Sequence, residues 1–291
     1  MNQMTSGPPF TTLIDAASLA ALITVGTATL FDCRFDLADP TSGRAGYRAG
    51  HIPGAHYLHL DEDLSAVPDG TNGRHPLPDR TAFAAHLAAV GVARGRQVVA
   101  YDTSGGPYAA RLWWMMRWLG HAEVAVLDGG LQAWTEAGHA LDVGDPGPAV
   151  PGDLIAAPPL VGTVSASDIF ATRDSGDLLV IDARAPDRFR GEPNPLDPVA
   201  GHIPGARSRF YRDNLSPNGR FKPAADLARE WDAVLDDTPP ATVALQCGSG
   251  VTAAHDLLAL EIAGRPGARL YPGSWSEWIS DPSRPVARGG A

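Results

Sequence analysis

Short hydrophobic runs alternate along the chain with segments in which apolar residues recur at helical spacing. Runs of buried-strand length occupy residues 28–31, 98–101, 124–127, 178–181, 243–245 and 269–271. Helical spacing occupies residues 81–90, 108–119, 225–235 and 251–263. Runs of this length predict strands covered on both faces, and their alternation with helices predicts mostly parallel sheets. The pattern therefore predicts an α/β fold in which mostly parallel sheets are flanked by helices.

The second half of the chain repeats landmarks of the first half. The matched landmarks are the hexapeptide GHIPGA at 50–55 and 201–206, DCR at 32–34 with DAR at 182–184, and a Gly…Trp pair at 129–134 and 273–278. Their offsets are 151, 150 and 144 residues. A nearly constant offset over three ordered landmarks indicates a duplicated domain.

The expected domain division follows from the repeat and from a change in composition. The segment 142–159 is rich in Gly and Pro and poor in charge, as interdomain linkers often are. The chain has 291 residues, which is about twice the usual domain length of roughly 150 residues. We therefore expect a first domain over residues 8–143, a linker over 144–160 and a second domain over 161–285.

The overall charge argues against several partners. Acidic residues outnumber basic ones by 33 to 23, which gives a formal net charge of −10. This balance disfavours a general affinity for nucleic acid or anionic membranes. No apolar run approaches the roughly 20 residues that span a bilayer, and the segment 1–10 lacks the pattern of a signal peptide. Two cysteines fit a reducing compartment, so we expect a cytoplasmic protein with no nucleic-acid or membrane partner.

Cys247 lies between a predicted strand and a predicted helix. A cysteine at the end of a parallel strand lies at the carboxyl edge of the sheet, where ligands bind in such folds. Gly248 and Gly250 let the backbone curl and point N–H groups inward, and the helix adds unpaired donors and the positive end of its dipole. The loop is therefore expected to stabilise a thiolate, or another anion carried on the sulfur.

Two other interpretations of this cysteine are an inert thiol and a phosphatase nucleophile. An inert buried thiol is the usual state of a free cysteine. A cysteine phosphatase would place His before the cysteine and Arg six residues after it, but Gln246 and Ala253 hold those positions. At the matching strand end the first half has Asp102, which cannot perform thiol chemistry, so we expect a non-reactive first domain. Cys33 corresponds to Ala183 and is expected to be structural.

Over nearly its whole length the chain resembles the two-domain rhodanese-type sulfurtransferases. The resemblance rests on the repeated GHIPG element, on LDGG…W at 127–134 and above all on CGSGVTA at 247–253. It implies two tandem rhodanese-like domains, the second of them catalytic. It also implies that the cysteine of the second domain carries sulfur as a persulfide.

Within this family the loop sequence CGSGVT resembles that of the 3-mercaptopyruvate sulfurtransferases. The thiosulfate enzymes typically carry basic residues after the cysteine, and a loop of amides with one hydroxyl offers no point charge to a compact dianion. The resemblance implies a small-molecule sulfur donor, 3-mercaptopyruvate, and an acceptor that is a thiol such as thioredoxin, or cyanide. A thiosulfate sulfurtransferase and a non-catalytic sulfur-carrier module remain as alternatives.

The resemblance also implies a catalytic set of Cys247, Ser249, His75 and Asp61. In the mercaptopyruvate enzymes an Asp and a His form a relay with the loop serine. The segment between Asp61 and His75 is a few residues longer than usual, so Asp63 is the alternative to Asp61.

Substrate binding is implied for Arg188, Gly248, Gly250, Val251 and Thr252. Arg188 matches a family arginine that binds the substrate carboxylate, a role that suits a planar guanidinium. A second such arginine usually follows a Glu-Pro-x-Pro-like stretch, but this chain has Leu196 there. The candidates to replace it are Arg190, Arg74 and Arg207.

The remaining motifs suggest structural roles. Arg184 has its twin in Arg34 of the non-reactive half, so we expect it to be structural. The nine histidines and two cysteines form no set with zinc-like spacing, and no glycine motif fits a nucleotide. We therefore expect no metal and no organic cofactor.

Overall fold

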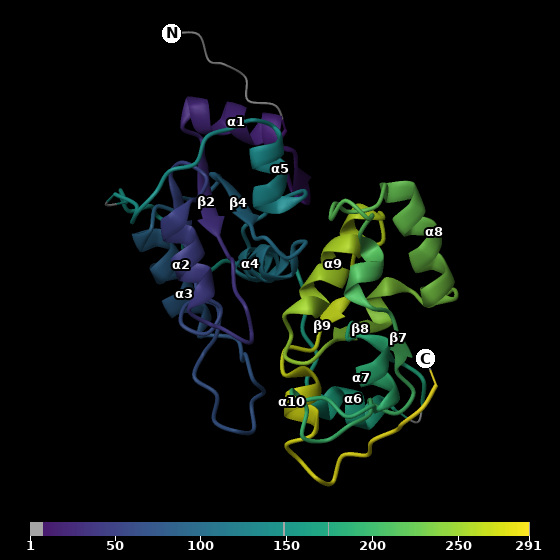
Figure 1. The fold of residues 1–291 in the computed structure, drawn as a ribbon. Coiled ribbons are helices and arrows are strands. Elements are labelled where there is room, and N and C mark those ends of the chain that lie inside the picture. Colours follow the sequence, from purple (N-terminus) through teal and green to yellow (C-terminus); the bar gives the residue numbers. More distant parts are fainter. Residues whose placement is uncertain (1–7, 148, 174, 291) are drawn as a thin grey trace.

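The computed structural model describes residues 8–147, 149–173 and 175–290, which form two similar halves (Figure 1). The first half holds a parallel sheet in the order β1-β5-β4-β2-β3. Its strands are β1 (Leu13–Ile14), β2 (Ala28–Asp32), β3 (Ala55–Tyr57), β4 (Gln97–Tyr101) and β5 (Val124–Leu127). The second half holds a parallel sheet in the order β7-β6-β8-β9. Its strands are β6 (Leu179–Asp182), β7 (Arg207–Ser208), β8 (Val243–Gln246) and β9 (Arg269–Leu270).

Helices flank both sheets. In the first half they are α1 (Ala16–Val25), α2 (Ser42–Ala49), α3 (Arg80–Ala89), α4 (Pro107–Trp118) and α5 (Gly130–Glu136). In the second half they are α6 (Ala166–Thr172), α7 (Pro186–Arg190), α8 (Ala224–Leu235), α9 (Thr252–Ile262) and α10 (Ser274–Trp278), with 3-10 helices η1 (Tyr211–Asn214) and η2 (Pro240–Thr242). The helices expected from spacing are α3, α4, α8 and α9. The predicted α/β fold with two tandem copies is confirmed.

The apolar runs form strands because both faces of each sheet are covered. In β4, Val98 and Ala100 belong to one buried cluster, whereas Val99 and Tyr101 belong to another. Alternate residues of a strand point to opposite faces. A strand buried on both faces therefore has no polar positions, which explains why its sequence is continuously apolar.

The repeated Asp-x-Arg motif makes the same contacts in both halves. Arg34 Nη2 donates to Asp32 at 2.6 Å and to the first carbonyl of its GHIPGA hexapeptide at 2.7 Å. Arg184 Nη2 donates to Asp182 at 2.7 Å and to the equivalent carbonyl at 2.8 Å. Each pair ties the end of a central strand to the hexapeptide, as the expected structural role of Arg184 requires.

The two halves share one hydrophobic core, which is centred where α4 packs against α9 (Figure 1). Trp113 and Trp114 of α4 line the same small gap as Leu257 and Leu260 of α9. Each of these helices follows the strand whose carboxyl end carries a glycine-rich loop. Their packing therefore presses the cysteine loop of the second half against the first half.

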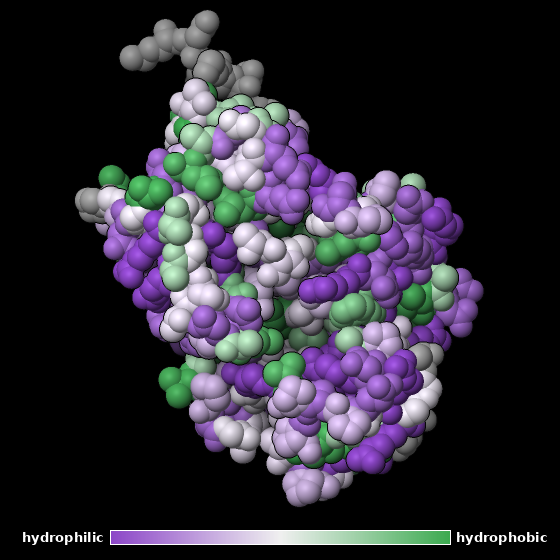
Figure 2. Space-filling view, viewed as in Figure 1, coloured by the Kyte–Doolittle hydropathy of each residue, from purple (hydrophilic) through white to green (hydrophobic). Residues whose placement is uncertain are grey.

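The segment between the halves lies against the first half. The N–H of Gly152 donates to the carbonyl of Ala88 at 2.8 Å, and the N–H of Ala157 donates to the carbonyl of Leu119 at 2.8 Å. Hydrophilic residues cover much of the face seen in Figure 2, with apolar residues scattered among them. Within the described residues, no helix is long and apolar enough to cross a membrane.

We expect Leu260→Ala to lower the free energy of unfolding by about 2–5 kcal/mol, because truncating a leucine in the shared core leaves a cavity. Leu260 is 1% exposed. Urea denaturation measures the change. Leu160→Ala is the control, because Leu160 is 48% exposed and its truncation should change stability by less than about 0.5 kcal/mol. Equal effects of the two variants would contradict a shared core.

Candidate active site

The cysteine loop, residues 247–251, joins the end of β8 to the start of α9. β8 is hydrogen-bonded to β6 on one side and to β9 on the other. The loop therefore follows an interior strand of the sheet and lies at the carboxyl edge. This is the position in which parallel α/β sheets bind ligands.

The loop directs backbone donors at the sulfur. The N–H of Gly250 donates to the Cys247 sulfur across 3.2 Å. From the other side, the N–H groups of Trp275 and Ser276 donate at 3.0 Å to the carbonyl oxygens of Cys247 and Gly248, so α10 fixes the loop. Cys247 is 2% exposed, so its sulfur is almost completely enclosed by the protein.

Three of the predicted catalytic residues form one chain of polar contacts. Ser249 Oγ lies 2.7 Å from His75 Nδ1, and His75 Nε2 lies 3.1 Å from Asp61 Oδ1. The alternative carboxylate, Asp63, instead lies 3.2 Å from His86 Nε2. The serine comes from the second half and the other two residues from the first. The chain of contacts thus crosses between the halves, and its geometry favours Asp61 over Asp63.

His75 is neutral at physiological pH. Burial, helped by the nearby Arg111 and Arg74 cations, lowers the pKa of His75 to about 3. A neutral imidazole has one donor nitrogen and one acceptor nitrogen. Assigning the proton to Nε2, which faces the Asp61 carboxylate, leaves Nδ1 free to accept a hydrogen bond from the Ser249 hydroxyl.

Arg111 is a site residue that sequence analysis missed. It is fully buried in α4, and it donates to the carbonyl oxygens of Gly250 at 3.1 Å, His75 at 3.0 Å and Leu64 at 3.3 Å. Burial lowers the pKa of Arg111 to about 10, and the Cys247 thiolate acts in the opposite direction. One guanidinium therefore fixes both the cysteine loop and the relay histidine. The same helix carries a second arginine, Arg117, which is only partly buried, so the sequence pattern does not single out Arg111.

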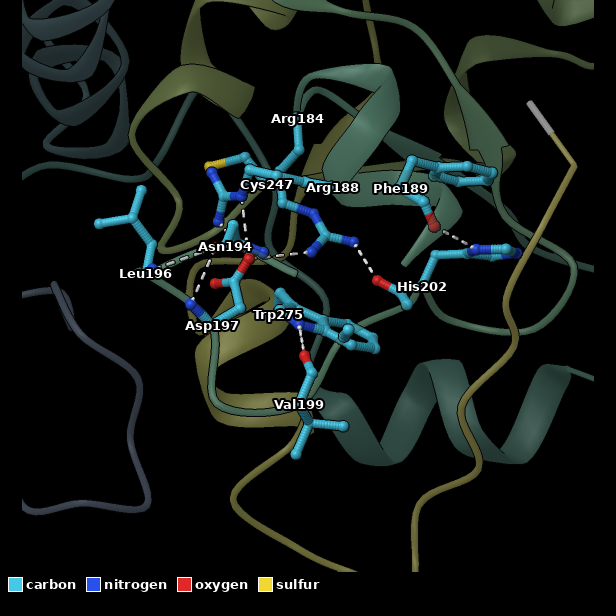
Figure 3. A network of polar contacts seen from close by, with 12 residues as sticks. Arg184, Arg188, Phe189, Asn194, Leu196, Asp197, Val199, His202, Cys247 and Trp275 are labelled. Atoms are coloured by element: carbon cyan, nitrogen blue, oxygen red, sulfur yellow. Dashed lines mark hydrogen bonds and ion pairs between the residues drawn. The ribbon is translucent and has the colours of Figure 1, made fainter. Parts of the chain in front are cut away.

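Arg188 lies against the cysteine loop, beside Asp197. A Cβ on Gly248 would lie 3.0 Å from Nη2 of Arg188. The Nε and Nη2 groups of Arg188 both donate to Asp197 Oδ2, at 2.9 and 2.6 Å. Figure 3 shows Arg184, Arg188 and Asp197 gathered near Cys247. Sequence analysis missed Asp197, because nothing in its local pattern marks a carboxylate that is paired with distant side chains.

The first half holds a carboxylate at the position that corresponds to the cysteine. Asp102 follows β4 as Cys247 follows β8. Its carboxylate accepts hydrogen bonds of 2.8–3.1 Å from the backbone N–H groups of Ser104, Gly106, Tyr108 and Ala109. A strand–loop–helix unit of this kind therefore surrounds an anion with amide donors.

The other predicted residues lie as follows. Gly250 has φ +76°, and a Cβ there would lie 2.4 Å from the Pro272 carbonyl oxygen, so only glycine fits. Val251 is buried at the end of the loop, and Thr252 begins α9. Cys33 is buried in the core, and burial raises the pKa of its thiol well above the usual value, in keeping with a structural role. No group of three potential metal ligands was found in the part of the chain that the structure describes.

Both halves match one family description. Residues 15–137 and 165–281 each match the rhodanese-like domain. The chain belongs to the rhodanese family. The glycine-rich loop that holds Cys247 in this rhodanese chain falls inside the second match.

The rhodanese relatives carry sulfurtransferase names. A Pseudomonas aeruginosa protein named "Probable 3-mercaptopyruvate sulfurtransferase" is 48% identical over 95% of this chain and 98% of its own length. The thiosulfate sulfurtransferase of Gallus gallus is 33% identical over 81% of each chain. The 3-mercaptopyruvate sulfurtransferase structure from Leishmania major has a TM-score of 0.81 at 29% identity, covering 94% of this chain and 75% of that one. The prediction of an enzyme of the sulfurtransferase class is confirmed.

We expect Gly250→Ala to slow sulfur transfer by about tenfold or more, because the new Cβ forces the loop away from Pro272 and withdraws the N–H from the sulfur. Gly264→Ala is the matched control, since Gly264 has φ +70° but no atom within 4 Å of a Cβ. It should lose only about 1–2 kcal/mol of stability and keep its activity. Steady-state rates and thermal unfolding separate the two variants. Equal loss of activity in both would contradict this account of the loop.

Two buried histidines should make the protein less stable in acid. Burial lowers the pKa of His75 to about 3 and that of His255 to about 4. Below the free-histidine value of about 6.5, the unfolded chain binds protons that the folded chain does not, so stability falls with pH by about 1.4 kcal/mol per unit for each group. Urea denaturation at several pH values between 7 and 5 measures this slope. His255→Gln should make the slope shallower; an unchanged slope in this variant would count against this assignment.

Proposed function

We propose that this enzyme transfers sulfane sulfur from 3-mercaptopyruvate to a thiol acceptor such as thioredoxin, or to cyanide, through a persulfide on Cys247. One observation carries the proposal. The cysteine loop directs a backbone N–H at the sulfur, while a neutral histidine accepts from the serine of the same loop. The loop of the Cys247 nucleophile therefore also carries Ser249, which with His75 can transfer a proton.

In the first step the Cys247 thiolate attacks the thiol sulfur of 3-mercaptopyruvate. An S–S bond forms, the donor's C–S bond breaks, and the electron pair of that bond leaves on the enolate of pyruvate. The thiol proton of the donor moves to the enolate carbon through Ser249, which is hydrogen-bonded to His75. Pyruvate departs and Cys247–S–S⁻ remains. In the second step an acceptor thiolate, or cyanide, takes the outer sulfur and restores the Cys247 thiolate.

The first half supplies an internal analogue of the persulfide. The same number of bonds separates Cα from a carboxylate oxygen in aspartate and from the outer sulfur in a cysteine persulfide. Each carboxylate oxygen of Asp102 accepts hydrogen bonds from two backbone N–H groups, Oδ1 from Ser104 and Gly106 and Oδ2 from Tyr108 and Ala109. The equivalent N–H groups of the second half belong to residues 249, 251, 253 and 254. We propose that the backbone N–H groups of Gly248, Gly250 and Thr252 hold the outer sulfur. Those of the four equivalent N–H groups that make no hydrogen bond within α9 bind it as well.

The remaining roles complete the proposal. Arg188 binds the donor's carboxylate and Asp61 orients His75. Arg111 adds a buried positive charge beside the loop that carries Cys247. The domain division 8–143, 144–160 and 161–285 and the cytoplasmic location remain our proposals from the sequence.

Thiosulfate is the second candidate donor. The arginines that surround Asp197 place guanidinium groups beside the loop, and these could bind a dianion even though the loop itself carries no basic side chain. A non-catalytic sulfur carrier is the third candidate. It would differ in forming no persulfide with either donor.

We expect kcat/KM for 3-mercaptopyruvate to exceed that for thiosulfate by about tenfold or more, because the relay serves a donor whose leaving group must gain a proton. Steady-state kinetics with both donors and one acceptor measures the ratio. A preference for thiosulfate would overturn the donor assignment.

Intact-mass measurement after incubation with donor is the companion test. The wild type and Cys33→Ser should gain the mass of one sulfur atom, and Cys247→Ser should gain none. No added sulfur in a folded wild-type sample would favour the carrier or binding role.

A further inference from the structure

The backbone of Arg74 is fastened to the elements that hold the cysteine loop. Its N–H donates to Ser276 Oγ at 2.9 Å, and the N–H of Ser276 donates to the carbonyl of Gly248 at 3.0 Å. The preceding Gly73 fits so closely that a Cβ there would lie 2.8 Å from the carbonyl oxygen of Gly273. Arg74 is thus a residue of the first half that is built into the catalytic site of the second.

The Arg74 side chain meets Arg188 across one carboxylate. Arg74 Nη2 donates to the carbonyl oxygen of Leu196 at 2.8 Å and lies 3.4 Å from Asp197 Oδ1. Arg188 holds the other oxygen of the same carboxylate. Asp197 therefore bridges guanidinium groups contributed by the two halves, next to the loop that carries Cys247.

This cluster has more positive than negative charge. Arg184 is paired mainly with Asp182, at 2.7 Å, and lies 3.4 Å from Asp197. The buried Asp197 is therefore the one carboxylate in this cluster that Arg74 and Arg188 share. Within the described residues, Nη1 of Arg188 and the Nε and Nη1 groups of Arg74 have no hydrogen-bond acceptor. Their side chains are 18% and 29% exposed. Free guanidinium donors with excess charge beside a nucleophile are suited to binding a carboxylate.

We propose that Arg74 is a donor-binding residue, and that Arg74 and Arg188 together bind the carboxylate of an α-keto acid donor. This inference rests on the proposed function and names a determinant of donor specificity for it. The first half then contributes a cation to substrate binding as well as the histidine to the relay.

The other arginines considered for this role face elsewhere. Arg190 is engaged by Glu192 at 2.6 Å in an exposed ion pair. Arg207 donates to the carbonyl of Val234 at 2.7 Å, at the edge strand β7. Arg74, by contrast, donates a hydrogen bond to the backbone carbonyl of Leu196. Its guanidinium thus lies next to position 196 of the second half.

Alkylation of Cys247 by a charged and a neutral reagent tests the proposal. Iodoacetate carries a carboxylate and iodoacetamide does not. In both reactions the thiolate sulfur forms a bond to the methylene carbon of the reagent, and iodide leaves. We expect Arg74→Met to slow iodoacetate about tenfold and iodoacetamide by less than about twofold, because one charged hydrogen-bonding partner of the carboxylate is lost. Peptide mass mapping restricts the rates to Cys247. Arg74→Lys should recover part of the loss, and Arg190→Gln is the matched control that should change neither rate.

Donor kinetics supply the second readout. Arg74→Met should raise KM for 3-mercaptopyruvate by a similar factor and leave kcat within about twofold. Equal slowing of both alkylating reagents, or no change in either, would overturn the proposal, because a structural role does not distinguish charge. Charge-selective alkylation that depends on Arg74, in an enzyme that does not turn over 3-mercaptopyruvate, would support the anion site while refuting the proposed donor.

Discussion

The packing of α4 against α9 is the contact on which the site depends. Alone, the second half would hold the nucleophile and its loop but neither the histidine nor the buried guanidinium. The shared core fixes the halves at one separation, so Ser249 lies 2.7 Å from His75 and Gly250 lies 3.1 Å from Arg111. A hydrophobic interface thereby sets polar distances that the flexible loop could not maintain unaided.

The site places a hydrogen-bond donor and a buried positive charge around the sulfur. The sulfur accepts an amide N–H, a fully buried arginine binds the carbonyl oxygen of the same glycine, and the nearby histidine is neutral. Burying an arginine without a carboxylate is costly, and an anion on Cys247 offsets part of that cost. The near-complete burial of Cys247 strengthens these interactions, because water does not screen them.

The duplication leaves a cysteine at one strand end and a carboxylate at the equivalent strand end of the other half. Both halves keep the Asp-x-Arg pair, the hexapeptide and a glycine-rich loop between a strand and a helix. In the first half the amides of that loop are already occupied by Asp102. A loop that binds its own carboxylate has no donors left for an external anion. The first half has instead become the source of His75, Arg111 and Arg74.

The sequence by itself determined the two-domain α/β fold, the sulfurtransferase class and the place of Cys247. Those inferences rest on local patterns, namely apolar runs, repeated hexapeptides and glycines whose spacing bends the backbone in any context. The family resemblance also predicted His75 and Asp61. Only the tertiary structure separates Asp61 from Asp63, because residues two apart can face different partners. Arg111 and Asp197 were decided by the tertiary structure alone. Their partners lie on other elements of the fold, and a buried charge is defined by what surrounds it in space rather than by its neighbours in the chain.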